Sequence, residues 1–161
     1  MRATDADPPD LVLRPAEPAD LVEIGELFWA ARVAAAPAMP SPMHPRSDVL
    51  AFYSAIDLAD GRETWVAEDA ATARLLGFAE VKREWLDDLY VLPAAQGRGV
   101  GSALLDLVKG LRPDGFGLWV FASNAPARAF YARHGLVEHE TTDGSGNEER
   151  APDVRLEWPG R

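Results

Sequence analysis

The sequence has no cysteine, few histidines and no long apolar run. Without cysteine, disulfides, thiolate metal ligands and cysteine nucleophiles are excluded. His44, His134 and His139 do not have the spacing of a zinc site, so we predict no metal. No apolar run approaches the roughly 20 residues that span a bilayer, so we expect no membrane partner. Residues 1–10 are acidic, contain proline and have no apolar core. They are therefore predicted to form a disordered tail and not a signal peptide, and the protein is predicted to be cytoplasmic.

Positive charge is also scarce. The chain has 16 Lys and Arg against 26 Asp and Glu, a formal net charge of −10 at pH 7. Nucleic-acid binders normally carry a basic surface, so we predict no nucleic-acid partner. Residues 96–135 are the exception, with five cations and two anions. From charge alone, a chance fluctuation and a site for an anion both stay open.

The apolar pattern predicts one α/β domain over residues 11–159. Strands are predicted over residues 11–14, 63–68, 74–82, 85–92, 116–122, 136–141 and 154–158. Four helices are predicted: one with its apolar face from Leu21 to Ala31, one from about residue 47 to Gly61, one that ends at Gly110 and one over residues 124–135. Helices that flank consecutive strands predict a mixed sheet of about six to seven strands, covered on both faces.

A glycine-rich segment follows the predicted strand over residues 85–92. Gly97, Gly99 and Gly101 directly precede a leucine-rich helical pattern. Glycine at a helix start exposes N–H groups that have no intrahelical partner, where the helix dipole adds positive charge. The segment therefore predicts an anion site, to which Arg98 adds a full charge. The spacing matches neither a P-loop nor a dinucleotide fingerprint. A connector without a ligand also stays open.

A second segment, residues 123–136, reads SNAPARAFYARHGL. Asn124 is a candidate helix cap and a candidate ligand contact, and the sequence does not decide between them. Phe130 is interpreted as core packing and His134 as a packed or partly exposed side chain. The hydroxyl of Tyr131 needs a partner if the ring is buried, which makes a functional role arguable.

Together the two segments resemble motifs of the GNAT N-acetyltransferase superfamily. The first resembles its acyl-CoA loop, Gln/Arg-x-x-Gly-x-Gly/Ala, through Gln96, Gly99 and Gly101. The second resembles the motif Asn-x-x-Ala-x-x-x-Tyr-x-x-x-Gly-Phe at Asn124, Ala127, Tyr131 and Gly135, with Leu136 in place of Phe. The order of elements also resembles the family along nearly the whole chain. This resemblance implies a mostly antiparallel sheet, splayed between the strands over residues 85–92 and 116–122.

The resemblance implies that acetyl-CoA is the co-substrate and lies in that opening. The backbone of Leu89, Tyr90 and Val91 would pair with the pantetheine arm as an added strand does. The N–H near Val91 would polarise the thioester carbonyl. The loop implied to hold the diphosphate through its amides comprises Gln96, Gly97, Arg98, Gly99, Val100, Gly101 and Ser102. The residues implied to hold the cofactor arm are Asn124, Ala127, Phe130 and Tyr131.

The resemblance also implies that Tyr131 is a general acid that protonates the departing thiolate. Some relatives carry a basic carboxylate on the strand that here covers residues 116–122, but this strand has none, and Trp119 stands about there. Asp87 and Asp88 are the nearest candidate bases. On a regular strand they point to opposite faces, so only one can face the cleft. Two alternatives stay open: both acids lie in solvent, or a water chain replaces the base.

These observations predict an N-acetyltransferase that acts on a primary amine of a small molecule or peptide. The acceptor is expected to enter beside the first two helices and the loops over residues 37–45 and 142–153. These segments are acidic or neutral, which favours a cationic acceptor. Two alternatives remain: a non-catalytic acyl-CoA-binding or regulatory module, and an acyltransferase for longer acyl groups. The resemblance also leaves a homodimer open.

Overall fold

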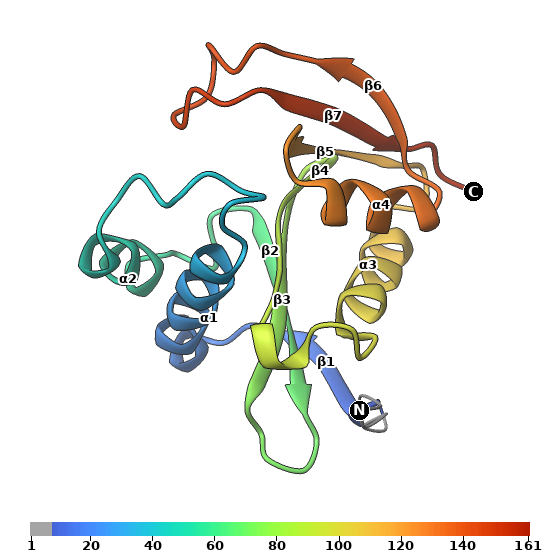
Figure 1. The fold of residues 1–161 in the computed structure, drawn as a ribbon. Helices are drawn as coiled ribbons and strands as arrows, with labels where there is room; N and C mark the ends of the chain where they lie inside the picture. The colour runs from blue at the N-terminus through green and yellow to red at the C-terminus, as the bar shows by residue number, and fades with distance from the viewer. Residues whose placement is uncertain (1–7) are drawn as a thin grey trace, which may run out of the picture.

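The computed structural model describes residues 8–161 (Figure 1). Most of the predicted N-terminal tail, residues 1–7, lies outside the described residues. The strands are β1 (Leu11–Pro15), β2 (Arg62–Asp69), β3 (Leu75–Lys82), β4 (Trp85–Val91), β5 (Phe116–Phe121), β6 (Val137–Thr141) and β7 (Asp153–Trp158). The helices are α1 (Leu21–Ala34), α2 (Arg46–Ser54), α3 (Val100–Leu111) and α4 (Ala125–Arg133), with short 3₁₀ turns η1 (Pro18–Asp20) and η2 (Pro93–Ala95). Across residues 8–161, every helix is too short or too polar to cross a membrane.

The strands form one sheet in the order β1-β2-β3-β4-β5-β7-β6. Every neighbouring pair is antiparallel except β4 and β5, which are parallel. In the described sheet, β4 and β5 pair at a single position, Trp85 opposite Gly117, and then diverge. The predicted mixed, mostly antiparallel sheet and its splay are therefore confirmed.

Helices cover both faces of the sheet. Figure 1 shows α1 and α2 on one side of β2–β4, and α3 with α4 on the other. Ile24 and Leu27 of α1 pack with Phe78 of β3 in one core cluster. In the other cluster, Leu104 and Leu105 of α3 are fully buried, so the predicted apolar stripe anchors this helix to the sheet.

The second helix is shorter than predicted. The sequence pattern placed its end near Gly61, but α2 ends at Ser54. Beyond it, the Asp57 carboxylate accepts a hydrogen bond from the N–H of Ala59 at 2.9 Å. An aspartate that bonds a nearby N–H competes with helical hydrogen bonding, which accounts for the early end.

A β-bulge interrupts β4. Glu80 of β3 lies opposite Asp88, but the next residue, Val81, lies opposite Leu86. Asp87 is therefore an extra residue in the described ladder, and the regular alternation expected for Asp87 and Asp88 is not kept. Bulges re-aim side chains and occur often beside active sites.

Candidate active site

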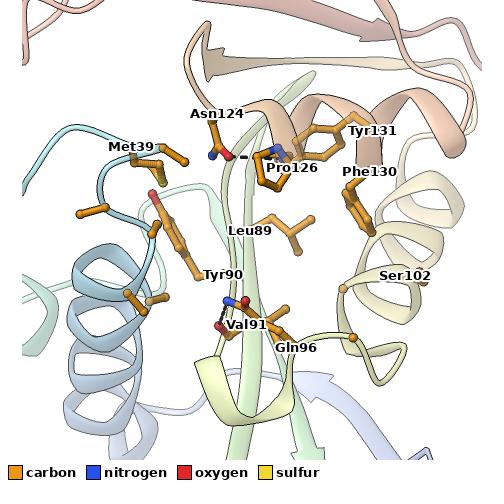
Figure 2. Close-up of a pocket in the computed structure, with 18 of the residues that line it drawn as sticks. Met39, Leu89, Tyr90, Val91, Gln96, Ser102, Asn124, Pro126, Phe130 and Tyr131 are labelled. Carbon is orange, nitrogen blue, oxygen red and sulfur yellow. Dashed lines mark hydrogen bonds between the residues drawn. The ribbon is translucent and has the colours of Figure 1, made fainter. Parts of the chain in front are cut away.

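The opening beside β4 holds a cavity of about 750 Å³ (Figure 2). Its wall includes most of the predicted cofactor-binding residues: Leu89, Tyr90, Val91, Gln96, Gly97, Gly99, Gly101, Ser102, Asn124, Ala127, Phe130 and Tyr131. The side chains of Arg98 and Val100 are not part of that wall, and Val100 is buried in the core. The structure thus brings together two segments that are separated in the sequence by β5.

The loop before α3 has the backbone that an anion site needs. Gly97 and Gly99 have φ of +75° and +85°, a conformation that favours glycine. Gly99 is the N-cap of α3, and the N–H of Ala103 bonds back to its carbonyl at 3.0 Å. The N–H groups of residues 100–102 lie before that first helical bond, so they are free of intrahelical partners. They form the positive end of the helix dipole, as predicted.

Gly101 leaves a channel between β4 and α4. A Cβ built there would lie 3.5 Å from the ring of Phe130 and 3.6 Å from the side chain of Val91. These are ordinary contact distances, so the protein's own packing does not require glycine here. The missing side chain instead keeps the cavity open between the strand and the helix.

The edge of β4 that faces the opening has hydrogen-bonding groups. The N–H of Leu92 bonds to Leu76 of β3 at 2.8 Å. Because pairing alternates along an antiparallel strand, the polar groups of Leu89 and Val91 point to the opened side. The Gln96 amide donates to the carbonyl of Val91 at 3.2 Å (Figure 2). The carbonyl and N–H of Leu89 and the N–H of Val91 remain for a ligand.

Asn124 has the capping role that the sequence left open. It is the N-cap of α4, and its Oδ1 accepts from the N–H of Ala127 at 3.3 Å (Figure 2). It also lines the 750 Å³ cavity. Its remaining amide group therefore lies at the cavity while its oxygen fixes the start of the helix.

Tyr131 stands where two cavities meet. Its side chain lines the 750 Å³ cavity and a second one of about 240 Å³ between β4, β5 and the β6–β7 loop. It is 8% exposed. Burial raises its pKa, and the charges of Tyr90 and Asp88 raise it further. The phenol therefore keeps its proton at neutral pH.

The second cavity has an apolar and an acidic side. Trp119, which is 45% exposed, lines it together with Asp87 and Met39. Met39 belongs to the loop after α1, and this loop is held to the end of β5 by a hydrogen bond from the Ser123 hydroxyl to the carbonyl of Ala38, 2.6 Å long. This cavity is on the side where the sequence predicted the acceptor to enter.

The bulge gives the two candidate bases different surroundings. Asp87 is exposed, and burial raises its pKa while Arg62 and Lys82 oppose that rise. Asp88 is half-buried, and burial raises its pKa to about 7, with the charges of Glu80 and Asp87 adding to the effect. Asp88 thus titrates in the range that suits a general base at neutral pH.

Asp88 also has a specific partner. The Tyr53 hydroxyl of α2 donates to its Oδ2 at 3.4 Å. Asp88 lies on the same side of β4 as Tyr90, two residues on, and Tyr90 lines both cavities. Asp88 itself lines neither cavity.

Sequence reasoning missed several residues at this site. Tyr53 and Glu80 surround Asp88. Residues 34–36 form one wall of the larger cavity together with residues 37–39, which belong to the loop expected beside the acceptor. Arg32, 7% exposed, holds that loop by donating to the carbonyl of Pro40 at 3.1 Å. No local motif marks these residues, because their proximity comes from packing between distant segments.

Residues 60–138 match the family model of the acetyltransferase (GNAT) domain. This match supports the resemblance to the GNAT superfamily. It is 32% identical over 98 residues to the peptidyl-lysine N-acetyltransferase YiaC of Escherichia coli K12. That match covers 60% of this chain and 64% of YiaC, so it spans less than two thirds of the relative.

Solved structures of other proteins show the same fold. The PaiA N-acetyltransferase of Thermoplasma acidophilum, in complex with coenzyme A, has a TM-score of 0.75 at 22% identity, over 93% of this chain and 99% of that one. The YncA protein of Salmonella typhimurium, solved with acetyl-CoA, has a TM-score of 0.69 at 21% identity, over 93% of this chain and 94% of that one. At these identities the likeness establishes the fold alone.

Proposed function

We propose that this protein is an acetyl-CoA-dependent N-acetyltransferase that acts on a primary amine. The observation that carries the proposal is the continuous arrangement of an exposed helix start, an open strand edge and a buried phenol. These are the α3 N-terminus, β4 and Tyr131, and all three line one cavity. The complexes of PaiA with coenzyme A and of YncA with acetyl-CoA support it.

The residues of the cavity fit acetyl-CoA. The N–H groups of residues 100–102 would hold its diphosphate, because an anion is favoured at a helix N-terminus. The edge of β4 and the channel beside Gly101 would hold the extended pantetheine arm. When bound, acetyl-CoA supplies a thioester that is open to attack by an amine.

Tyr131 would act as the general acid. Its phenol keeps its proton because burial raises its pKa. It would give that proton to the sulfur as the thiolate departs. A thiol with an ordinary pKa of about 8.5 leaves readily as an anion, so the phenol need only donate late.

Asp88 would act as the base. An alkyl amine has an ordinary pKa near 10.4, so it must lose a proton before it attacks. A carboxylate with a pKa of about 7 can accept that proton across one water or hydroxyl. Asp87 lines the smaller cavity but lies in the exposed bulge. Its carboxylate is therefore better suited to attract a cationic acceptor than to accept a proton.

The 240 Å³ cavity would receive the acceptor. Trp119 gives it an aromatic wall and Asp87 an acidic one. An aliphatic chain that ends in a cation suits such walls, because indole rings attract cations. A lysine side chain and a small alkyl amine both have this form. The similarity to the peptidyl-lysine N-acetyltransferase YiaC supports the lysine side chain.

Thiol release from acetyl-CoA tests this function. The protein should release free thiol at a rate that saturates with at least one amine from a panel of lysine-containing peptides, peptide N-termini and small alkyl amines. Saturable acetyl-CoA binding without release for every acceptor would support a non-catalytic acyl-CoA-binding module instead.

Gly101→Val tests the channel. We expect acetyl-CoA affinity to fall at least about tenfold, because branched methyl groups would extend toward Phe130 and Val91 and narrow the space for the pantetheine arm. Isothermal titration measures the affinity. Gly110→Ala is the matched control in the same helix, since a Cβ there meets nothing within 4 Å. Equal affinity in the valine variant would show that the arm does not pass beside Gly101.

A further inference from the structure

His134 connects the end of α4 to the start of α3. It is half-buried at the C-cap of α4. Its Nδ1 lies 2.8 Å from the carbonyl oxygen of Phe130, and its Nε2 lies 3.1 Å from the Ser102 hydroxyl. Ser102 belongs to the first turn of α3 and lines the 750 Å³ cavity. The histidine is thus in direct contact with the proposed diphosphate site.

The hydrogen-bond partners fix the tautomer of the neutral ring. A carbonyl oxygen can only accept, so Nδ1 must carry the hydrogen that bonds to Phe130. The neutral ring then has a lone pair on Nε2, and Ser102 must donate to it. The single hydroxyl hydrogen of Ser102 is therefore committed to His134.

The surroundings hold the ring in place. The Phe130 ring lies with its centroid 4.4 Å from that of the imidazole. From α3, the Lys109 ammonium donates to the backbone carbonyl of His134 at 2.6 Å. Rotation of the ring away from Ser102 would break its contact with the Phe130 ring and the Nδ1 hydrogen bond, so the imidazole and the hydroxyl stay paired.

Binding of a diphosphate would conflict with this arrangement. Ser102 in its present orientation presents oxygen lone pairs to an anion at the helix start, which is repulsive. If its hydroxyl turned to donate to the diphosphate, the half-buried Nε2 would lose its partner, and an unpaired buried polar group is costly. A proton on Nε2 removes both costs, because N–H then donates to the Ser102 oxygen and leaves the hydroxyl hydrogen free.

The local charges indicate when that proton is taken up. The charged groups on the two helices that hold His134 are Asp106 and Lys109 of α3 and Arg128 and Arg133 of α4, with Arg98 in the loop before α3. Arg128 is paired with Glu138 of β6 at 2.8 Å. A diphosphate adds negative charge at this point, which favours a proton on Nε2, and the C-terminal end of α4 also favours a cation.

We propose that His134 and Ser102 form a proton-linked pair that takes up one proton when the diphosphate of coenzyme A binds. The inference rests on the proposed function, since it needs that ligand. The proton comes from the solvent and forms the N–H bond on Nε2, the Ser102 hydroxyl turns to donate to a diphosphate oxygen, and no other bond changes. His134 is here a positioning residue that acts through Ser102.

Isothermal titration in several buffers tests the pair. The probe is acetyl-CoA without its 3′-phosphate, which has neither a phosphate monoester nor a free thiol to titrate near neutral pH. The binding heat is measured at pH 7.5 in buffers without primary amines that differ in ionisation enthalpy. The slope of heat against ionisation enthalpy gives the protons taken up. We expect at least about half a proton per bound ligand, because the proposed change forms one N–H bond on Nε2.

Two variants locate the proton. His134→Gln and Ser102→Ala should each bring the uptake close to zero, and Ser102→Ala should weaken binding about tenfold through the loss of a charge-assisted hydrogen bond. His139→Gln, on β6, is the matched control and should leave the uptake unchanged. Saturable binding without uptake in the unaltered protein, or uptake that persists in His134→Gln, would overturn the inference alone. Absence of binding heat would overturn the proposed function and this inference with it.

Discussion

Tyr131→Phe is expected to lower kcat by about 10²–10⁴-fold, the usual contribution of a general acid. The substitution removes the hydroxyl but keeps the ring, which is 8% exposed and packed among core side chains. The binding of acetyl-CoA should therefore change little. Because the proton is needed only in the transition state, kcat and kcat/KM should fall by similar factors. Steady-state thiol release and isothermal titration measure the two quantities.

Tyr90→Phe is the matched control for this experiment. Tyr90 also lines both cavities, and burial raises its pKa as it does for Tyr131. It projects from β4 and is not in the family motif, so loss of its hydroxyl should lower kcat by much less. If Tyr131→Phe turned over as fast as the unaltered protein, Tyr131 would have no part in proton transfer.

The backbone of the proposed cofactor site was predictable because its determinants are local. The positive φ at Gly97 and Gly99, and the capping bond that Asn124 accepts from the N–H of Ala127, follow from residue type at fixed spacing in two short segments. The splay between β4 and β5 is different, because no residue pattern in either strand indicates it. Only the resemblance to the family implied the splay, and the structure confirms it.

The acceptor side could not be predicted in the same way, because long-range packing determines it. The bulge at Asp87 depends on the register in which β3 and β4 pair, and no residue pattern in β4 indicates it. The contact between Tyr53 and Asp88 joins residues 35 apart. Likewise, the wall that Met39 contributes depends on how its loop folds back toward β5. In each case the residue is visible in the sequence, but no local pattern indicates which distant residue it contacts.

Asp88→Asn is expected to lower kcat/KM by about 10²-fold or more, because the amide cannot accept a proton. The pH profile distinguishes this role from a structural one. A base works when ionised, and burial raises the pKa of Asp88 to about 7. In the unaltered protein, kcat/KM should therefore rise with pH and level off above about 7. In the asparagine variant this rise should be absent.

Two neighbouring acids provide controls for that profile. Asp87→Asn should change kcat/KM by less than about tenfold and leave the rise in place, since Asp87 is exposed in the bulge. Glu80→Gln should shift the rise to lower pH, because the charge of Glu80 raises the pKa of Asp88. If kcat/KM still rose with pH in Asp88→Asn but no longer rose in Asp87→Asn, the base would be Asp87.

Asp88 should also affect the stability of the fold, and the direction of that effect with pH follows from its raised pKa. The ordinary pKa of its carboxyl is 3.8, and burial raises it to about 7 in the folded protein. The folded state therefore binds the proton more tightly than the unfolded chain, and stability falls as pH rises through this interval. Asp88→Asn removes this loss, so the Tm of the variant relative to the unaltered protein should be higher at pH 8 than at pH 4. Thermal unfolding at both values measures it. A relative Tm independent of pH would mean that water keeps the carboxylate solvated, and such a group would be too weak a base at neutral pH for the mechanism proposed.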